Sequence, residues 1–303
     1  MLVENDYEVK KLTSFKVGGK IQKVFFPEYL DEFATCLQQY PDAFVCGNMT
    51  NTLVSTDGYD GVLILTTKMT GYSIEGTKVT AECGLKGPKL SQAVAEKGLS
   101  GLEFMVAFPG TIGGEVFMNA GAHGQMIKDA FVSGKFFDRE QNKIITLNKE
   151  EMEFSYRTSI CQKHNLTVLS ADFELTEKPV EDIKALMKEN LEFRHTHQPS
   201  LALPNCGSVF RNPEGNSAGR LLEEAGAKSF TTGGARVWEN HANFIINDST
   251  ATSTDILELM LKMQQAVKEN SGISLMPEVR YLGNKNKKEE DICKILYQNL
   301  VKM

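Results

Sequence analysis

The stretch Phe108-Pro-Gly-Thr-Ile-Gly-Gly-Glu-Val-Phe-Met-Asn-Ala-Gly-Ala-His-Gly124 contains five glycines. Because glycine has no Cβ and tolerates positive φ, such a cluster lets backbone N–H groups come close to a flat or phosphorylated ligand. The spacing matches neither the G-x-G-x-x-G pattern of dinucleotide-binding loops nor the G-x-x-x-x-G-K-[ST] pattern of phosphate-binding loops. The cluster therefore predicts a cofactor site of another kind, and the competing interpretation is that these glycines only form turns.

The composition is typical of a globular protein with a sizeable core. The chain has 303 residues, of which 41% are hydrophobic and 24% charged, which suits two or three domains. A net charge of −6 disfavours nucleic acid or an anionic membrane surface as the main partner. The N-terminal residues show no signal-peptide pattern, and no segment approaches the roughly 18 apolar residues of a membrane-spanning helix. We therefore expect a cytoplasmic protein.

The cysteines and histidines follow no metal-binding or disulfide pattern. The six cysteines have no C-x-x-C spacing, so we expect reduced thiols. His195 and His197 lie two apart in a polar stretch, where a solvated pair is the expected arrangement. We predict no metal site.

The first half of the chain alternates short strands with helices. Apolar runs predict strands at residues 23–26, 62–65 and 78–82, and later at residues 131–137, 143–147 and 167–175. Helical spacing predicts a helix near residues 30–39 and a second, proline-started helix that ends at Gly98. The middle of the chain is therefore expected to be rich in β structure.

The composition changes at Glu177-Lys-Pro179, where we place a domain boundary. Beyond it, apolar periodicity predicts helices near residues 180–191 and 254–268 and a strand at residues 277–282. A charged stretch then leads to a short tail striped with Ile292, Ile295, Leu296 and Leu300, expected to be a packed or dangling helix. The predicted segments are residues 1–65, 66–178, 179–283 and 284–303.

Three further segments concentrate residue types that carry chemistry. They are Ser155-Tyr-Arg-Thr-Ser159, Pro204-Asn-Cys-Gly-Ser-Val-Phe-Arg-Asn-Pro213 and Leu275-Met-Pro-Glu-Val279. Taken singly, Arg157 reads as a surface arginine, Ser208 as a turn serine and Glu278 as a solvated carboxylate. Their joint occurrence with the glycine cluster favours a functional interpretation.

The same segments resemble the motifs of a known enzyme family, the UDP-N-acetylenolpyruvoylglucosamine reductases (MurB). The resemblance covers nearly all of the chain before Gly283 and is carried by motifs in a fixed order. These motifs are Thr13-Ser-Phe-Lys-Val-Gly-Gly-Lys20, Gly98-Leu-Ser-Gly-Leu-Glu-Phe104, Pro109-Gly-Thr-Ile-Gly-Gly114, Met118-Asn-Ala-Gly-Ala-His-Gly124, Tyr156-Arg-Thr-Ser159, Gly207-Ser-Val-Phe-Arg-Asn-Pro213, His241-Ala-Asn-Phe-Ile-Ile-Asn247 and Pro277-Glu-Val279. The modest length is similar to the shorter type, which lacks a tyrosine-bearing loop.

The resemblance implies a fold, a reaction and two cofactors. The implied fold is α+β, with two subdomains of the PCMH or vanillyl-alcohol-oxidase type that hold FAD between them and a C-terminal α/β domain for the substrate. The implied reaction is the reduction of UDP-N-acetylglucosamine enolpyruvate to UDP-N-acetylmuramate in peptidoglycan precursor synthesis, with NADPH as reductant. The implied partner is thus a small nucleotide sugar, and nucleic acid, membrane and metal are not expected.

The resemblance also assigns residues, each at its matching position in this chain. Arg157 and Glu278 polarise the substrate carboxylate, and Ser208 delivers a proton to the neighbouring carbon. The implied cofactor-binding residues are Gly47, Asn48, Met49, Thr50, Asn51, Pro109, Gly110, Thr111, Gly113, Gly114, Asn119, Gly121 and Ala122. The expected substrate-binding residues are Tyr156, Arg194, Gln198, Arg211 and Asn212.

Elementary chemistry agrees with the three catalytic roles. Hydride addition to the terminal vinyl carbon leaves negative charge on the other carbon and its carboxylate, so cationic and donor groups must face those oxygens. The planar guanidinium of Arg157 suits a carboxylate. Glu278 helps only if it is protonated or acts through water. An enolate-like carbanion is basic enough to take a proton from Ser208 at close range.

Among the departures from the family pattern, two bear on FAD binding. Met49 stands where the Gly-x-Gly-Ser-Asn turn has its second glycine; positive φ there would cost roughly 1 kcal/mol, and the side chain would crowd a phosphate. Glu115 replaces a small residue and is expected to bring a carboxylate near the flavin or its phosphates. Two alternatives therefore stay open, a nucleotide-sugar binder with weakened FAD binding and a flavin oxidase acting on another substrate.

Overall fold

The computed structural model describes residues 1–200 and 202–298. The chain forms two compact units, the first containing Val24–Asn48 and Val62–Arg194 and the second containing Asn5–Lys23, Met49–Gly61 and most of the chain after Arg194. The four segments predicted from the sequence are a finer division, and their bounds stay a prediction. Leu300, placed on the apolar stripe of the tail, lies outside the described residues.

Four elements continue from one unit into the other along the chain. They are β1 (Leu2–Glu8), β2 (Lys20–Phe26), β5 (Tyr59–Leu65) and α5 (Val180–His197). The first unit otherwise contains α1 (Leu30–Gln39), β3 (Phe44–Cys46), β6 (Tyr72–Glu75), β7 (Lys78–Glu82), α2 (Gly87–Ala95), β8 (Leu99–Ser100), η1 (Glu103–Ala107), α3 (Ile112–Phe117), β9 (Gly121–Ala122), β10 (Gln125–Met126), α4 (Ile127–Ala130), β11 (Phe131–Asp138), β12 (Lys143–Asn148), η2 (Ile160–Gln162), β13 (Leu166–Glu174) and β14 (Thr176–Glu177).

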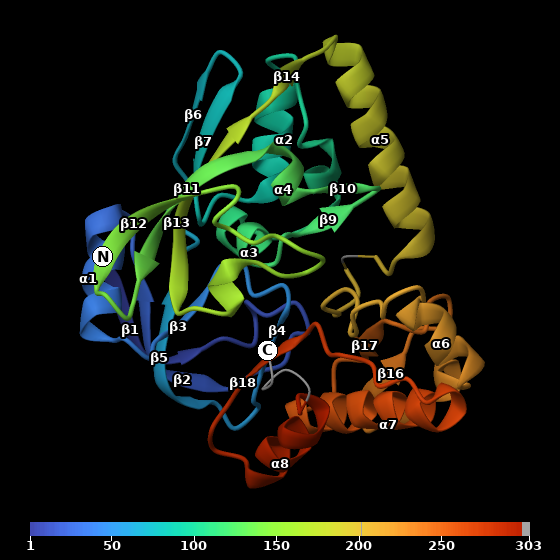
Figure 1. The fold of residues 1–303 in the computed structure, drawn as a ribbon. Coiled ribbons are helices and arrows are strands. Elements are labelled where there is room, and N and C mark those ends of the chain that lie inside the picture. The colour runs from blue at the N-terminus through green and yellow to red at the C-terminus, as the bar shows by residue number, and fades with distance from the viewer. Residues whose placement is uncertain (201, 299–303) are drawn as a thin grey trace. The chain divides into compact units, whose positions relative to one another are not determined.

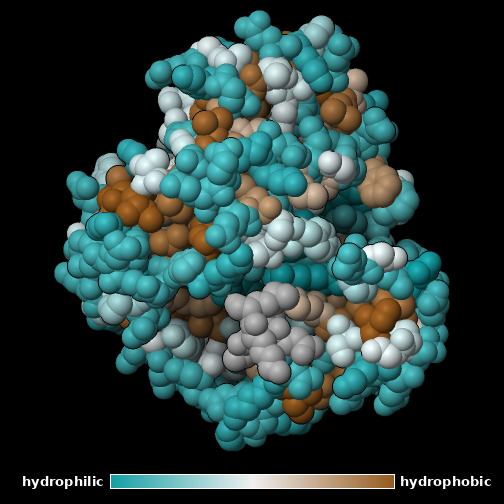
Figure 2. Space-filling model, viewed as in Figure 1, coloured by the Kyte–Doolittle hydropathy of each residue, from teal (hydrophilic) through white to brown (hydrophobic). Residues whose placement is uncertain are grey.

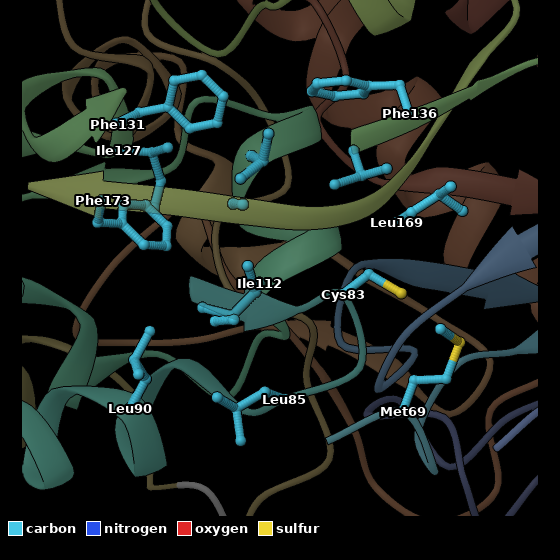
Figure 3. Packing of buried hydrophobic residues seen from close by; sticks show 14 of the residues in the cluster. Met69, Cys83, Leu85, Leu90, Ile112, Ile127, Phe131, Phe136, Leu169 and Phe173 are labelled. Carbon is cyan, nitrogen blue, oxygen red and sulfur yellow. The ribbon is translucent and has the colours of Figure 1, made fainter. Parts of the chain in front are cut away.

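The first unit is built around a five-stranded antiparallel sheet. Its order is β12-β11-β13-β7-β6, and α2 and α3 lie beside it (Figure 1). The apolar face of the sheet meets these helices in one core, part of which Figure 3 shows, with Phe136 and Leu169 from the strands and Leu90 and Ile112 from the helices. A separate four-stranded sheet has the order β1-β2-β5-β3, in which β3 pairs with β5 in parallel.

The second unit has its own core and its own short sheets. Its elements are β4 (Thr52–Val54), α6 (Ala218–Glu224), η3 (Ala227–Ser229), β15 (Thr231–Thr232), β16 (Ala235–Val237), β17 (Ile245–Asn247), α7 (Ser253–Ser271), β18 (Arg280–Leu282) and α8 (Lys287–Leu296). Helix α7 begins at a capping box formed by Thr252 and Asp255 and ends at Gly272 in the left-handed conformation. It buries Ile256, Met260 and the rest of its apolar stripe in the core of this unit.

The tail helix α8 is fixed to the second unit by the buried side chain of Glu289. Its Oε1 accepts hydrogen bonds from Ser253 Oγ at 2.5 Å and Thr254 Oγ1 at 2.7 Å. Its Oε2 accepts hydrogen bonds from Ser55 Oγ at 2.7 Å and the Tyr281 hydroxyl at 2.6 Å. Of the two possibilities left open for the tail, the structure shows the packed helix over α8.

Most of the predicted elements are confirmed. The helix predicted at residues 30–39 and the strand predicted at residues 78–82 coincide with α1 and β7, and α5 and α7 contain the two later predicted helices. The strand predicted at residues 277–282 is shorter, because only Arg280–Leu282 pair with β4. The glycine cluster contains α3 and β9, and β9 pairs with β10 directly after the cluster; the sequence predicted neither the helix nor the hairpin.

The face of the protein shown in Figure 2 is mostly hydrophilic, with small scattered apolar areas. Exposed apolar side chains such as Tyr29, Val132 and Ile295 come from different elements. Isolated apolar residues of this kind are normal on a protein surface. Within residues 1–200 and 202–298, no helix has both the length and the apolar character needed to span a membrane.

Candidate functional site

The glycine cluster packs against the loop that follows β3 in the first unit, which contains Gly47 and Asn48. A Cβ at Gly47 would lie 2.0 Å from Thr111 Oγ1, so only glycine allows this contact. The Asn48 side chain donates a hydrogen bond from Nδ2 to the carbonyl of Pro109 at 2.9 Å. Residues from two of the predicted cofactor motifs, Gly47-Asn48 and Pro109-Gly110-Thr111, are thus brought together.

Different physical reasons explain why glycine occupies the individual positions of the cluster. A Cβ at Gly113 would lie 2.9 Å from Cys83 Cβ, and one at Gly121 would lie 2.5 Å from the Gln125 carbonyl oxygen, so these two glycines allow close packing. Gly124 has φ +79° and forms a turn. At Gly114 a Cβ would have no neighbour nearer than 3.9 Å and φ is ordinary. Gly114 is therefore the glycine of the cluster at which a ligand could approach the backbone.

Asn119 connects the cluster to the turn that carries Arg157. The buried Asn119 donates from Nδ2 to the Ser155 carbonyl at 2.8 Å and accepts from the Lys128 N–H at 3.0 Å. Ser155 and Thr158 close the turn with reciprocal backbone hydrogen bonds. This connection makes Asn119 a positioning residue for Arg157.

Arg157 is held in an unusual backbone conformation. Its φ is 54°, in the left-handed region that a residue with a side chain adopts only at a cost. Its guanidinium donates from Nη1 to the Gly121 carbonyl at 3.2 Å and lies 5.4 Å from the centre of the Tyr156 ring. The side chain is half-buried, and this hydrogen bond holds its guanidinium beside β9.

Glu115, in α3, brings a buried carboxyl group next to Gly87 and Gly110 in the first unit. The residue is 3% exposed, and neither carboxyl oxygen has a hydrogen-bond partner among the described residues. Burial raises the pKa of Glu115 from its ordinary value of 4.5 to about 8, so the group is mostly protonated at neutral pH. The expected negative charge near the cofactor motifs is therefore corrected to a mostly neutral carboxyl group.

In the second unit, the extended segment that contains Ser208 pairs with the segment that contains Glu278. The Glu278 N–H donates to the Val209 carbonyl at 2.8 Å, and the Arg211 N–H donates to the Met276 carbonyl at 2.9 Å. Ser208 precedes Val209 directly, so the backbone segment of the predicted proton donor runs alongside that of the predicted carboxyl group. Both side chains are partly exposed and accessible to a ligand.

The loop before β4 also reaches Glu278. Strands β4 and β18 are parallel, so the residues that precede them lie at the same edge. Asn51 Nδ2 donates to the Glu278 carbonyl at 2.8 Å, and Asn51 O accepts from the Arg280 N–H at 3.0 Å. No sequence signal indicates that Asn51 and Glu278 lie together, because their contact depends on the pairing of two distant strands.

The backbone of Met49 has a φ of 50°. This is the positive φ at which the sequence analysis predicts strain for a residue with a side chain. Its side chain is 2% exposed and therefore lies inside the protein. The expected crowding of a phosphate by this side chain stays a prediction. The backbone strain at Met49 remains.

Cys206 is the other group that could donate a proton near Glu278. Burial and the nearby charge of Glu278 raise the pKa of the Cys206 thiol well above its ordinary value. The thiol is therefore a weaker acid than a free cysteine. All six cysteines are free thiols in the structure, as expected from the sequence.

The expected substrate-binding residues occupy varied environments. Tyr156 is exposed beside Arg157, whereas Arg194 is 7% exposed near the end of α5, where burial lowers its pKa. Gln198 follows α5 directly, and Arg211 lies on the segment that pairs with Met276. Asn212 Oδ1 accepts the N–H of Ala218, the first residue of α6, at 3.0 Å, which gives it a structural role as well.

The remaining expected cofactor residues are Thr50, which lies in the second unit between Met49 and Asn51, and Ala122, which lies in β9. The buried Oδ1 of Asn51 has no hydrogen-bond partner in the described part of the chain, which leaves an acceptor for a ligand. No group of three or more His, Cys, Asp or Glu side chains among residues 1–200 and 202–298 is arranged to hold a metal ion.

Comparison with known proteins gives consistent matches. Residues 198–282 match the UDP-N-acetylenolpyruvoylglucosamine reductase C-terminal domain, and residues 21–148 match an FAD binding domain. The UDP-N-acetylenolpyruvoylglucosamine reductase of Caldicellulosiruptor bescii is 40% identical over 92% of this chain and 90% of its own length. That of Caldicellulosiruptor saccharolyticus is 38% identical over 92% of this chain and 91% of its own length.

A solved structure agrees with these relatives. The crystal structure of UDP-N-acetylenolpyruvylglucosamine reductase (MurB) from Thermus caldophilus matches with a TM-score of 0.80 and 32% identity, covering 93% of this chain and 99% of that chain. It confirms the expected fold, a mixture of helices and sheets with an FAD-binding part and a C-terminal domain. Two domain models match the chain, relatives are up to 40% identical over most of their length, and one solved structure matches over nearly its full length. This chain therefore belongs to the UDP-N-acetylenolpyruvoylglucosamine reductase family.

Proposed function

We propose that this FAD-dependent reductase uses NADPH to convert UDP-N-acetylglucosamine enolpyruvate to UDP-N-acetylmuramate, with Arg157, Ser208 and Glu278 as its catalytic residues. The observation that carries the proposal is the backbone pairing of Val209 with Glu278, which brings the segment that contains Ser208 alongside the segment that contains Glu278 in the second unit. The family membership supplies the reaction class. The reaction belongs to peptidoglycan precursor synthesis.

FAD, when bound, would supply the chemistry of hydride transfer from NADPH to the vinyl group of the substrate. The residues proposed to hold it fit such a cofactor. Gly47 packs directly on Thr111, and Gly114 leaves its face of α3 open for close approach. Asn51 offers a buried acceptor without a partner in the described residues. These features support an FAD cradle in the first unit made of Gly47, Asn48 and the Pro109–Gly114 segment.

Each catalytic side chain has a separate task. Arg157 binds the substrate carboxylate and stabilises the charge that develops on it, because a guanidinium fork matches two carboxylate oxygens. Glu278 assists there when it carries a proton or acts through a water molecule. Ser208 donates its hydroxyl proton to the carbon next to the carboxylate.

The nucleotide-sugar part of the substrate is assigned to Tyr156, Arg194, Gln198, Arg211 and Asn212. Arg211 is the best supported of these, because it lies on the segment that also carries Ser208. In a protein of net charge −6, such local cations are needed to attract a diphosphate. Six free thiols suit a reducing compartment, so we expect the enzyme to act in the cytoplasm.

Steady-state kinetics of the purified full-length protein test this function. We expect a yellow protein with flavin absorption bands, and NADPH oxidation that depends on added UDP-N-acetylglucosamine enolpyruvate. A colourless protein that binds the nucleotide sugar but cannot be reconstituted with FAD would instead indicate a binding protein. Rapid reoxidation of the reduced flavin by oxygen, without dependence on the nucleotide sugar, would indicate an oxidase.

A further inference from the structure

Glu115 is a buried carboxyl group for which the proposed mechanism has no use. It is 3% exposed, and both of its carboxyl oxygens lack a hydrogen-bond partner within residues 1–200 and 202–298. Burying an unpaired polar group is costly, and burying an unpaired charge costs far more. A buried carboxyl group in such surroundings therefore holds its proton more tightly than an exposed one.

The carboxyl group of Glu115 is lodged against two glycines. A Cβ at Gly87 would lie 2.3 Å from Oε1, and a Cβ at Gly110 would lie 2.8 Å from the same oxygen. The Gly87 N–H donates to the Gly110 carbonyl at 3.2 Å, and Lys86 forms a β-bridge with Thr111. Glu115 thus packs directly on the backbone of the segment that holds Gly110 and Thr111.

In the described part of the chain, no cationic group lowers the pKa of Glu115. Lys86 and Lys89, which flank Gly87, have exposed side chains, and burial alone accounts for the raised pKa of Glu115. Cys83, packed on Gly113, stays neutral because burial raises its pKa to about 12.

The position of Glu115 in the first turn of α3 acts in the opposite direction. A helix N-terminus stabilises a carboxylate by about 0.3–1 kcal/mol, which corresponds to less than one pKa unit. Burial raises the pKa of Glu115 from 4.5 to about 8, so burial dominates. The group consequently loses its proton in a pH range that experiments reach easily.

We propose that Glu115 couples proton binding to FAD binding, so that the protein holds FAD less tightly once Glu115 is ionised. This rests on the proposed placement of FAD on the Pro109–Gly114 segment. The diphosphate of FAD is negatively charged, and a carboxylate behind that segment repels it through a medium of low dielectric constant. Bound FAD therefore raises the proton affinity of Glu115 further, and by linkage the ionised apoprotein binds FAD more weakly.

The pH dependence of FAD binding follows from the proton affinities of Glu115 in the free and in the FAD-bound protein. Below about pH 8 both the free and the FAD-bound protein keep the Glu115 proton, so FAD affinity does not depend on this group. Above about pH 8 the free protein loses the proton while the FAD-bound protein keeps it. The dissociation constant for FAD then rises with pH, by at most about tenfold per pH unit.

The experiment measures FAD release from the holoenzyme by dilution at a series of pH values from about 6.5 to 9.5, using the fluorescence of free FAD. It compares the wild type with Glu115→Gln, and with Glu115→Ala in case the glutamine variant folds poorly. The matched control is Glu103→Gln, which alters a second buried glutamate in the first unit whose Oε2 already accepts a hydrogen bond from the Gly101 N–H.

We expect the FAD dissociation constant of the wild type and of Glu103→Gln to rise above about pH 8, and that of both Glu115 variants to stay flat. Ionisation of the flavin itself is common to all of these proteins and cancels in the comparison. An equal rise in the Glu115 variants, or no rise in the wild type, rejects the coupling but leaves the proposed function intact. Failure of every protein to retain FAD at any pH rejects both.

Discussion

Arg157 and Met49 share a left-handed backbone conformation, with φ values of 54° and 50°. For a residue with a Cβ this conformation costs roughly 1–2 kcal/mol, so the surrounding structure must enforce it. At Arg157 this conformation is held by the Ser155–Thr158 turn and by the hydrogen bond that Nη1 donates to the Gly121 carbonyl. Strain at a charged side chain that is fixed in this way agrees with the proposed role in binding the substrate carboxylate.

Replacing Ser208 by alanine should separate the two half-reactions. We expect flavin reduction by NADPH to stay near the wild-type rate, because this step does not need the Ser208 proton. Product formation should slow by about 10²-fold or more, the usual cost of losing a general acid. Stopped-flow absorbance of the flavin, recorded first with NADPH and then with the enolpyruvyl substrate, measures both steps.

Cys206→Ala is the control for Ser208→Ala, because Cys206 is the neighbouring group that could donate a proton in its place. We expect this variant to keep the rate of product formation within a fewfold of the wild type. If Cys206→Ala slowed product formation as strongly as Ser208→Ala, the assignment of the proton to Ser208 would be wrong. Equal slowing of both half-reactions in Ser208→Ala would also contradict it.

At the scale of elements, α3 shows how a short helix can form through two consecutive glycines. Helix propensity disfavours Gly113 and Gly114 by about 1 kcal/mol each relative to alanine. Packing compensates, because Gly113 lets α3 approach Cys83 and its N–H donates to the Cys83 carbonyl at 2.8 Å. Gly114 has no such packing reason, which leaves ligand approach as its explanation.

Gly114→Ala should therefore have opposite effects on stability and cofactor binding. Without FAD, alanine should stabilise α3 by about 0.5–1 kcal/mol, since its Cβ would meet no atom nearer than 3.9 Å. With FAD, the same methyl group should occupy the face proposed for the cofactor and raise the FAD dissociation constant about tenfold or more. Urea unfolding of the apoprotein and FAD fluorescence titration measure the two effects, and unchanged FAD affinity would refute the proposed cradle.

Helix α8 depends on Glu289, which accepts hydrogen bonds from four hydroxyl groups of the second unit. Glu289→Ala leaves these donors without their acceptor and should destabilise the second unit by about 3–5 kcal/mol. The single tryptophan, Trp238, lies in this unit, so its fluorescence during urea unfolding reports the effect.

The neighbouring Glu290→Ala is the matched control for Glu289→Ala. Glu290 only forms an exposed ion pair with Lys287 at 3.4 Å, and such pairs contribute about 0.2–0.5 kcal/mol. We therefore expect almost no change in the urea midpoint of this variant. A similar loss in both variants would show that α8 is sensitive to any substitution and not specifically to the buried carboxyl group.

At the scale of the whole molecule, Glu115 should make the stability of the apoprotein depend on pH. The folded protein keeps the Glu115 proton up to about pH 8, whereas the unfolded chain releases it near pH 4.5. Between these values the unfolded state binds fewer protons, so the free energy of unfolding falls by about 1.4 kcal/mol per pH unit as pH rises. The contribution is complete below pH 4.5 and lost above about pH 8.

Urea unfolding of the wild type and of Glu115→Gln, followed by circular dichroism at pH 5 and pH 7, isolates this contribution. We expect the wild type to lose about 3 kcal/mol more than the variant over this interval, because all other titrating groups are common to both. Parallel pH dependence of the two proteins would mean that Glu115 is ionised in the folded state.

The sequence alone was sufficient for features that depend on neighbouring residues. Apolar periodicity located α1 and β7, since a helix or strand is defined by residues close together in the chain. The order of the motifs indicated the family, which the relatives and the solved structure confirm. Arg157, Ser208 and Glu278 were identified by residue type within those motifs, and their catalytic roles stay a prediction.

Only the tertiary structure decided features that depend on contacts between distant segments. The pairing of Val209 with Glu278 and the contact of Asn51 with Glu278 arise from strand register, which local sequence does not encode. The sequence suggested that Glu115 would carry a negative charge, but its burial against Gly87 and Gly110 makes the neutral form the stable one. The physical reason is the same in both cases: solvation and pairing are properties of the packed chain.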